Sequence, residues 1–119
     1  MSYFQERYVN EQYSKYMNFR QNRRILLDNS TAKNVYPYED GFMIYAWGFY
    51  RINPNETVEI SMSPAPGQKI ISGGYSVNSP QYYPTIFSNL TVSPSTYLII
   101  MRNSHAVGID IVVTIVAKN

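Results

Sequence analysis

Beyond its first 24 residues the chain alternates short apolar runs with clusters of Pro, Gly, Asn and Ser. This punctuation is typical of an all-β fold, because these residues favour turns between strands. One run shows the period of a half-buried strand, since Val58, Ile60 and Met62 alternate with Glu59 and Ser61. The pattern predicts eight strands, the first two short, at residues 25–27, 34–36, 42–52, 57–62, 69–77, 85–92, 96–103 and 108–117.

The last predicted strand is unusual because residues 109–116 are apolar almost throughout. A continuous apolar run indicates a strand that is covered on both faces. Two arrangements explain this: the strand is central in a sandwich, or its outer face is covered by the N-terminal region or by another subunit. Trp47, between Ala46 and Gly48 in the longest predicted strand, is expected in the core.

The first 24 residues follow a different pattern and contain neither Pro nor Gly. Most of them are compatible with a helix and Ser2 can cap the first turn, so one helix is predicted from Ser2 to about Arg24. Its large side chains occupy several faces, so it is expected to contact more than one neighbour. The alternative is a helix that packs across one face of its own β domain. The large residues at helical spacing are Phe4, Tyr8, Tyr16 and Phe19, and those on other faces are Tyr3, Tyr13 and Met17.

These patterns divide the 119 residues into an N-terminal helical arm at 1–27 and a β-sandwich domain at 28–119. A chain of 13.8 kDa is large enough for one core. The predicted fold class is mainly β, a β-sandwich or jelly roll of about 7–8 strands with an N-terminal α-helical arm.

The composition excludes some ways of stabilising this fold, and the positive charge is concentrated at the N-terminal end of the chain. The chain has no cysteine, which excludes disulfides, thiolate zinc sites and a thiol nucleophile. Five of the ten Lys and Arg residues and only two carboxylates fall within the first 24 positions, so the arm carries +3 and the remainder −1 of the net charge of +2. Twelve tyrosines suit either protein interfaces or a pleated sheet surface. Neither a secretory signal nor a membrane span is expected, since no apolar segment fits one.

Residues that could support catalysis are sparse. His105, the only histidine, lies in a turn-like segment without a nucleophile-elbow pattern nearby. Glu39 and Asp40 are adjacent, and adjacent side chains rarely converge as a glycosidase acid and base must. Gly73 and Gly74 precede no helix pattern, so they indicate a bulge or a close backbone approach rather than a phosphate-binding loop. We therefore expect no enzyme activity, catalytic residue, metal site or cofactor.

Candidate contact residues concentrate in the arm and in one loop. The arm is expected to dock on a protein partner, with contact to nucleic acid phosphates as a weaker hypothesis and a solvated helix end as the simplest explanation of its arginines. The longest irregular stretch, residues 79–84, carries Tyr82 and Tyr83 as possible ligand or surface contacts. If the protein binds carbohydrate or a cell surface, these two tyrosines, Trp47 or Tyr75 are the expected stacking platforms. The predicted partner-docking residues are Phe4, Tyr8, Tyr13, Tyr16, Phe19, Arg20, Arg23 and Arg24.

The second half of the chain resembles a β-sandwich half of phage virion and bacterial surface proteins. In these, a strand similar to residues 73–77 (GGYSV) precedes a connection similar to Ser93-Pro94, a strand ending in Asn as at 97–103, and an apolar strand as at 109–117. An arm followed by a β module is also similar to phage head-fibre, decoration and tail-attachment proteins.

This resemblance implies a non-enzymatic structural virion protein of a bacteriophage, assembled in the host cytoplasm. It would form a homotrimer or larger oligomer and dock on neighbouring capsid or tail proteins through its arm. The alternative function is a carbohydrate or cell-surface binding module.

Overall fold

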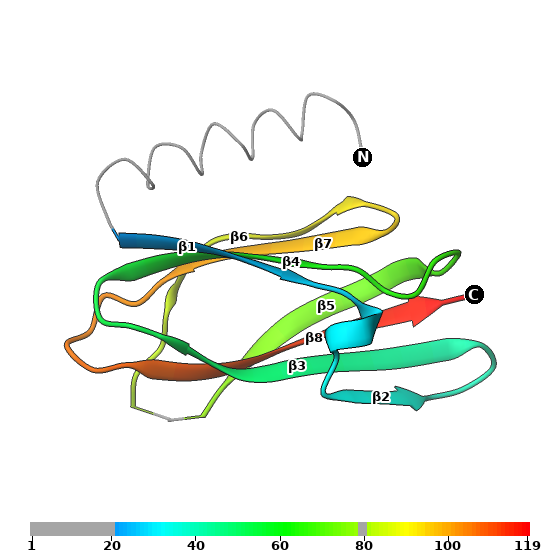
Figure 1. Cartoon of the computed structure of the whole chain (residues 1–119), viewed down its shortest axis with the longest axis horizontal. Helices are drawn as coiled ribbons and strands as arrows, with labels where there is room; N and C mark the ends of the chain where they lie inside the picture. Colours follow the sequence, from blue (N-terminus) through cyan, green and yellow to red (C-terminus); the bar gives the residue numbers. More distant parts are fainter. Residues whose placement is uncertain (1–20, 79–80) are drawn as a thin grey trace.

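The computed structural model describes residues 21–78 and 81–119, and it is mainly β (Figure 1). The predicted mainly β fold with about 7–8 strands is thereby confirmed, and the strands at 42–52 and 69–77 have the predicted bounds. The arm helix expected up to residue 20 lies outside the described residues. The elements are β1 (Gln21–Leu27), the 3-10 helix η1 (Asn29–Thr31), β2 (Asn34–Pro37), β3 (Phe42–Ile52), β4 (Glu56–Met62), β5 (Lys69–Val77), β6 (Thr85–Ser93), β7 (Thr96–Arg102) and β8 (Ile109–Lys118).

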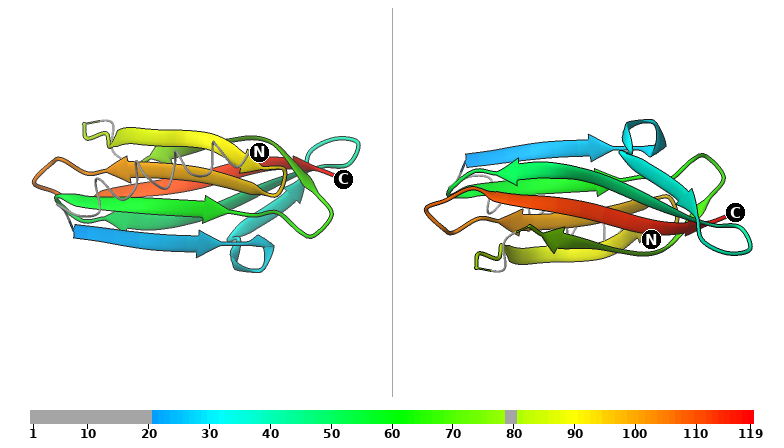
Figure 2. Two further views of the ribbon diagram at one scale, coloured as in Figure 1. Left: turned by 90° about the horizontal axis from the view of Figure 1, so that it is seen from above. Right: turned by 90° about the horizontal axis from the view of Figure 1, so that it is seen from below.

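The strands form two four-stranded sheets that lie face to face as the layers of a sandwich (Figures 1 and 2). Sheet I has the strand order β1-β4-β7-β6, and sheet II has the order β2-β3-β8-β5. All neighbouring strands are antiparallel except β1 and β4, which are parallel. Only the β2–β3 and β6–β7 connections stay within one sheet. All the remaining connections between these strands cross from one sheet to the other.

β1 corrects the sequence analysis, because the helix prediction is wrong for residues 21–24. They form the first half of β1, which pairs along its length with β4. Helix propensities differ by less than about 1 kcal/mol per residue, so tertiary pairing overrides them. Arg23 and Arg24 form ion pairs with Glu56 and Glu59 of β4, which stabilises this polar segment as an edge strand. β1 is therefore a strand of the sandwich, although it lies on the arm side of the expected domain boundary.

The core lies between the sheets and receives alternate residues from each strand. In β8 the inward residues from Ile109 to Ala117 are buried, whereas the outward residues between them are half-buried. β8 is central in sheet II, between β3 and β5, as the first arrangement considered for this strand has it. Its outward residues are only half-buried, so the expectation that the strand is covered on both faces is wrong for the outer face. Large buried side chains of this core include Trp47, Ile52, Ile60, Met62, Ile99, Met101, Ile109, Ile111 and Ile115.

Trp47 lies in the core as predicted. Its ring N–H donates to the backbone carbonyl of Asp28 at 2.9 Å, and its ring stacks on Tyr45 with the centroids 6.0 Å apart. A buried indole N–H needs such an acceptor. The bond therefore ties the end of β1 to the middle of β3.

The predicted close backbone approach at the two adjacent glycines is confirmed at Gly73. A Cβ at this position would lie 2.8 Å from ring atoms of Tyr97 in the opposite sheet. The hydroxyl of Tyr97 donates to Oδ1 of Asn89 at 2.5 Å, which holds the ring in place. Gly74 faces the other way, and a Cβ there would meet no atom within 4 Å.

Candidate protein-docking surface

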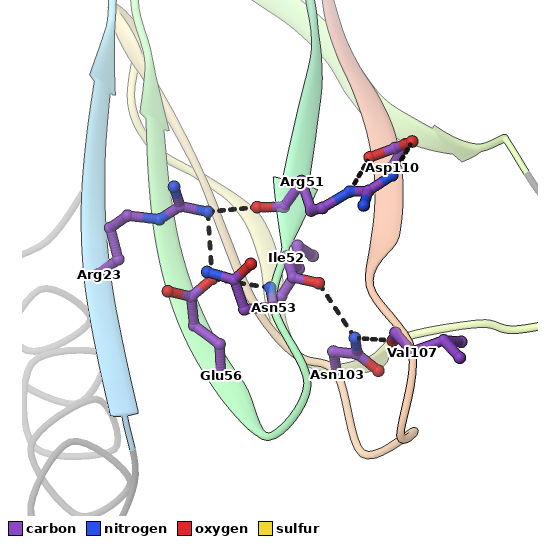
Figure 3. A network of polar contacts seen from close by, with 8 residues as sticks. All are labelled: Arg23, Arg51, Ile52, Asn53, Glu56, Asn103, Val107 and Asp110. Atoms are coloured by element: carbon purple, nitrogen blue, oxygen red, sulfur yellow. Dashed lines mark hydrogen bonds and ion pairs between the residues drawn. The ribbon is translucent and has the colours of Figure 1, made fainter.

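A network of polar contacts joins the two sheets at one end of the sandwich (Figure 3). Nη2 of Arg23 on β1 donates to the backbone carbonyl of Arg51 on β3 at 2.5 Å and to Oε1 of Glu56 on β4 at 3.1 Å. The same carboxylate oxygen accepts the backbone N–H of Asn53 at 3.1 Å. Glu56 is buried, so these partners offset the cost of removing its charge from water.

Asn103, a fully buried residue directly after β7, extends this network. Its Nδ2 donates to the carbonyl oxygens of Ile52 at 3.0 Å and Val107 at 2.7 Å, and its Oδ1 accepts the backbone N–H of His105 at 2.9 Å. Its own backbone N–H and carbonyl pair with the turn between β3 and β4. All polar groups of Asn103 are thus satisfied, as buried polar groups generally are. The network therefore accounts for stability at this end of the sandwich and needs no ligand to complete it.

Within residues 21–78 and 81–119, no group of three or more His, Cys, Asp or Glu residues is placed to hold a metal ion. The same part of the chain contains no helix of the length and apolar character needed to cross a membrane. What the structure offers instead is an extended sheet surface.

The outer face of sheet II presents small and apolar side chains around β8. The register places outward residues of β3 beside those of β8, for example Ala46 opposite Thr114 and Ile44 opposite Val116. None of the other described elements lies over this face (Figure 2, right). This surface, which we name the β8 face, comprises Tyr36, Ile44, Ala46, Gly48, Ser72, Gly74, Ser76, Val112, Thr114 and Val116.

Charged side chains stand at the two ends of the β8 face rather than in its centre. At one end, Arg51 and Asp110 form a two-bond ion pair, with Nε–Oδ1 at 2.9 Å and Nη2–Oδ2 at 3.0 Å. Hydrogen bonding from Arg51 lowers the pKa of the Asp110 carboxyl below its usual range. At the other end, Nζ of Lys118 lies 5.0 Å from the centre of the Phe42 ring. The centre of the face is therefore uncharged.

This distribution suits a surface that contacts protein. The centres of protein interfaces are depleted of charge, and their rims are polar. Gly and Ser at the outward positions of β5 add no bulk, so the face is flat at its edge. The β8 face can support docking, and it carries no convergent acid, base or nucleophile for catalysis.

The arm residues predicted to dock on a partner fall into two groups. Arg23 and Arg24 are paired with Glu56 and Glu59, so their positive charge is matched by carboxylates of β4. This weakens the nucleic acid hypothesis for these two arginines, because phosphate binding needs cations without such partners. The remaining predicted docking residues, Phe4, Tyr8, Tyr13, Tyr16, Phe19 and Arg20, lie outside the described residues.

The two loop tyrosines differ in exposure. The half-buried Tyr82 packs edge-on against the His105 ring, with the centroids 5.1 Å apart. Tyr83 is largely exposed, with 59% of its surface accessible to solvent. Its backbone carbonyl oxygen lies 3.1 Å from Nε2 of His105. Trp47 is buried and Tyr75 packs against the core, so neither offers an open ring face as a sugar platform.

Comparison with known proteins assigns a family. A family model named YjdH matches residues 23–117, which span both sheets. The chain belongs to the YjdH family. No curated protein and no solved structure matches it. The YjdH match includes the polar network and all of the β8 face, and it begins after the arm residues that the structure leaves undescribed.

Sequence reasoning missed the β8 face of this YjdH protein. The continuous apolar run of the last strand predicts burial on both sides, and it does not distinguish an open face from a covered one. A signal was present in the neighbouring strand, where the alternate positions Ser72, Gly74 and Ser76 are all small. Small polar residues on one side of β5 indicate that this side lies outside the core.

Proposed function

We propose that this YjdH protein is a non-enzymatic structural module that assembles with further copies of itself through the β8 face. The observation that carries the proposal is the uncharged outer face of a central strand, with Val112, Thr114 and Val116 half-buried rather than covered. Apolar patches on a protein surface mark interaction sites. A second sheet packed at about 10 Å would cover these side chains, as the sheets of a sandwich cover each other.

The charges at the ends of the face favour a second copy as the occupant. Asp110 and Arg51 stand at one end and Lys118 at the other. When two copies pack face to face with their β8 strands in opposite directions, Lys118 of one lies near Asp110 of the other. The surface is thus complementary to itself, as a two-fold interface requires.

The size of the β8 face limits the strength of this contact. Three strands about 4.8 Å apart, each contributing about seven residues of roughly 3.3 Å, together with the 4 residues of β2, cover about 400 Å² per copy. Stable interfaces bury about 800 Å² per partner. We therefore expect weak, concentration-dependent association through this face alone, which becomes firm only when several contacts act together.

A bacteriophage particle is the setting that we propose, on the strength of the sequence resemblance to head-fibre, decoration and tail-attachment proteins. Such particles repeat one weak contact many times by symmetry, which suits the β8 face. Packing through this face joins two copies, so a homotrimer or larger oligomer needs a second contact. The arm, proposed to be helical, would dock on neighbouring capsid or tail proteins and so hold several copies side by side in the particle. The protein would then reside in the virion after assembly in the host cytoplasm.

The test is the solution mass of the full chain by light scattering over a concentration series. We expect the mass to rise above the 13.8 kDa of one chain as concentration increases. Thr114→Arg places a long cation in the centre of the β8 face and should keep the protein monomeric. Ala106→Arg, in the exposed loop before β8, is the matched control and should associate as the natural protein does. A natural chain that stays monomeric at all concentrations would contradict the proposal.

The alternative function, binding of carbohydrate or a cell surface, rests on the exposed ring of Tyr83. Aromatic side chains are amphipathic and can contact the apolar face of a sugar. A glycan array that detects binding by the natural protein, and loses it with Tyr83→Ala, would support this alternative. A blank array would count against it.

A further inference from the structure

β5 ends sheet II on the side of the sandwich where β6 ends sheet I (Figure 2). Among the described strands, only β8 pairs with it. The outer edge of such a strand presents backbone N–H and C=O groups that can bind another strand, so natural proteins protect most of their edges. The sandwich has three further edge strands, β1, β2 and β6, which allow a comparison.

The other three edges each carry a feature that hinders pairing. β2 has only 4 residues and ends in Pro37, which has no N–H to donate. β1 carries Arg23 and Arg24 in its middle. The pairing of β6 shifts register twice, between residues 86 and 88 and between 91 and 93. Short length, proline, charge and bulges are all known means of blunting an edge.

β5 is the least protected of the four edges. It has 9 residues, and after Lys69 at its start it contains neither a charge nor a proline. Its one register shift lies near the start, between Ile70 and Ser72. From Ser72 to Val77 the strand is therefore regular and uncharged, which suits it to pairing with a further strand.

The bonds between β5 and β8 show which backbone groups face this edge. The N–H of Asn78 donates to the carbonyl of Asp110 at 2.9 Å, so the backbone groups of Asn78 point toward β8. Residues along an antiparallel strand alternate between hydrogen-bonded and non-bonded positions. Two residues before Asn78 the groups again face β8, whereas those of Gly73, Tyr75 and Val77 face the open edge.

We propose that β5 pairs antiparallel with β5 of a second copy, about a two-fold axis at Gly74. In this register Gly73 of each copy lies opposite Tyr75 of the other, and each such pair exchanges two backbone hydrogen bonds. On the outward side Ser72 lies opposite Ser76, and the two Gly74 residues lie opposite each other. The contact is made by the same residues of both copies, as a two-fold interface requires.

The side chains of β5 suit this register. A Cβ at Gly74 would meet no atom within 4 Å, so the two strands can approach closely on the outward side. The ring of Tyr75 comes beside Gly73, and an aromatic side chain next to a cross-strand glycine stabilises a sheet. Ile71, of which 56% is exposed, comes near Val77 of the second copy. The carbonyl of Gly73 lies 3.3 Å from the Tyr97 hydroxyl and can accept a second hydrogen bond.

Edge pairing also joins the β8 faces of two copies into one surface, a consequence that rests on the proposed function. The face of one copy covers about 400 Å², so the joined face covers about 800 Å², the area that a stable interface buries per partner. An isolated pair of strands is only marginally stable in water, so edge pairing alone remains weak. It supplies the second contact that an assembly larger than a dimer needs, which favours a second copy over an unrelated peptide.

Disulfide formation in the full chain tests the register, because the natural chain has no cysteine. Gly74→Cys places two Cα atoms about 4.5 Å apart across the non-bonded pair, a separation that a disulfide spans. Under mild oxidation we expect a disulfide-linked dimer on non-reducing electrophoresis. Ser72→Cys, on the same strand and face, is the matched control. Its two copies lie four residues apart along the strands, more than about 13 Å, so it should give about fivefold less dimer. Equal yields would overturn the proposal.

A second variant separates the edge contact from the β8 face contact. Two faces packed about 10 Å apart leave the Gly74 positions too distant for a disulfide. Ala46→Arg places a cation on the β8 face, two strands away from β5, and should abolish the rise of mass with concentration. Gly74→Cys combined with Ala46→Arg should still form the linked dimer, although more slowly.

The two contacts can therefore fail independently. If the mass of the natural chain rises with concentration but Gly74→Cys yields no linked dimer, edge pairing is wrong and the proposed function stands. If Gly74→Cys links efficiently while the natural chain stays monomeric at all concentrations, edge pairing is supported and the β8 face contact is wrong.

Discussion

The two outer faces of this sandwich use similar apolar strands for different purposes. On sheet I, Leu98 and Ile100 are buried and a carboxylate, Glu59, is buried with them. On sheet II, Val112 and Val116 stay half-buried, and the charges stand at the ends of the strands. The outward apolar side chains of β7 are thus almost fully buried, whereas those of β8 remain partly exposed. Apolar character alone therefore does not identify a docking surface, and the degree of burial does.

The largest expected effect comes from the same truncation on each face. Ile100→Ala should lower the free energy of unfolding by about 3 kcal/mol, because it leaves a cavity under a covered surface. Ile44→Ala, on the half-buried β8 face, should lower it by less than about 1 kcal/mol. Urea denaturation of both variants measures the difference. Equal losses would show that the two faces are not distinct.

Two neighbouring glycines of β5 provide a smaller contrast between inside and outside. Gly73→Ala forces a methyl group against the Tyr97 ring and should cost about 2 kcal/mol through overpacking. Gly74→Ala meets open space on the β8 face and should stabilise the fold by roughly 0.5 kcal/mol, since it restricts the unfolded chain. Thermal denaturation should therefore move the two midpoints in opposite directions. A loss at Gly74 as large as that at Gly73 would mean that the β8 face is not open at this position.

The smallest expected effect is the pH dependence of two carboxylates. Burial raises the pKa of Glu59, with Arg24 opposing it. The folded protein then takes up this proton before the unfolded chain does, so the contribution of Glu59 to the free energy of unfolding rises as pH falls from the raised pKa toward about 4.3. The hydrogen bond from Arg51 lowers the pKa of Asp110, so its contribution is present above about 3.9 and is lost as pH falls through the lowered pKa.

Two variants isolate these opposite slopes. Glu59→Gln should remove the rise between neutral pH and about 4.3, and Asp110→Asn should remove part of the loss below about 3.9. Urea denaturation at a series of pH values, compared with the natural protein, measures both. If Glu59→Gln instead steepened the rise toward acid, the assigned pKa direction would be wrong.

Most of the fold followed from local chemistry. The residues that favour turns marked the ends of β3 and β5, because they tolerate backbone conformations that strands do not use. Residues 21–24 were misassigned because their stability as a strand depends on Glu56 and Glu59, which lie more than thirty positions away. No local pattern in the polar segment itself carries that information.

The candidate site was less accessible to sequence reasoning than the fold. The alternation along β8 is partly hidden in the sequence, because two of its outward residues, Val112 and Val116, are as apolar as the inward ones. The network around Asn103 joins turns that are distant in sequence, and its geometry depends on the crossing between sheets. The paired state of Arg23 and Arg24 likewise required the register of β1 against β4.

The parallel pairing of β1 and β4 also has a mechanical consequence. Gln21 begins β1 at one end of the sandwich, and the chain leaves β8 at the opposite end (Figure 1). Tension between the N-terminal side and the C-terminus therefore runs along the strand axes, and it shears β1 against β4. In this geometry the bonds of the ladder resist together rather than opening one after another. If the protein is pulled between its arm and its C-terminus, β1 should therefore stay paired with β4 at forces that would open the strands of a hairpin one bond at a time.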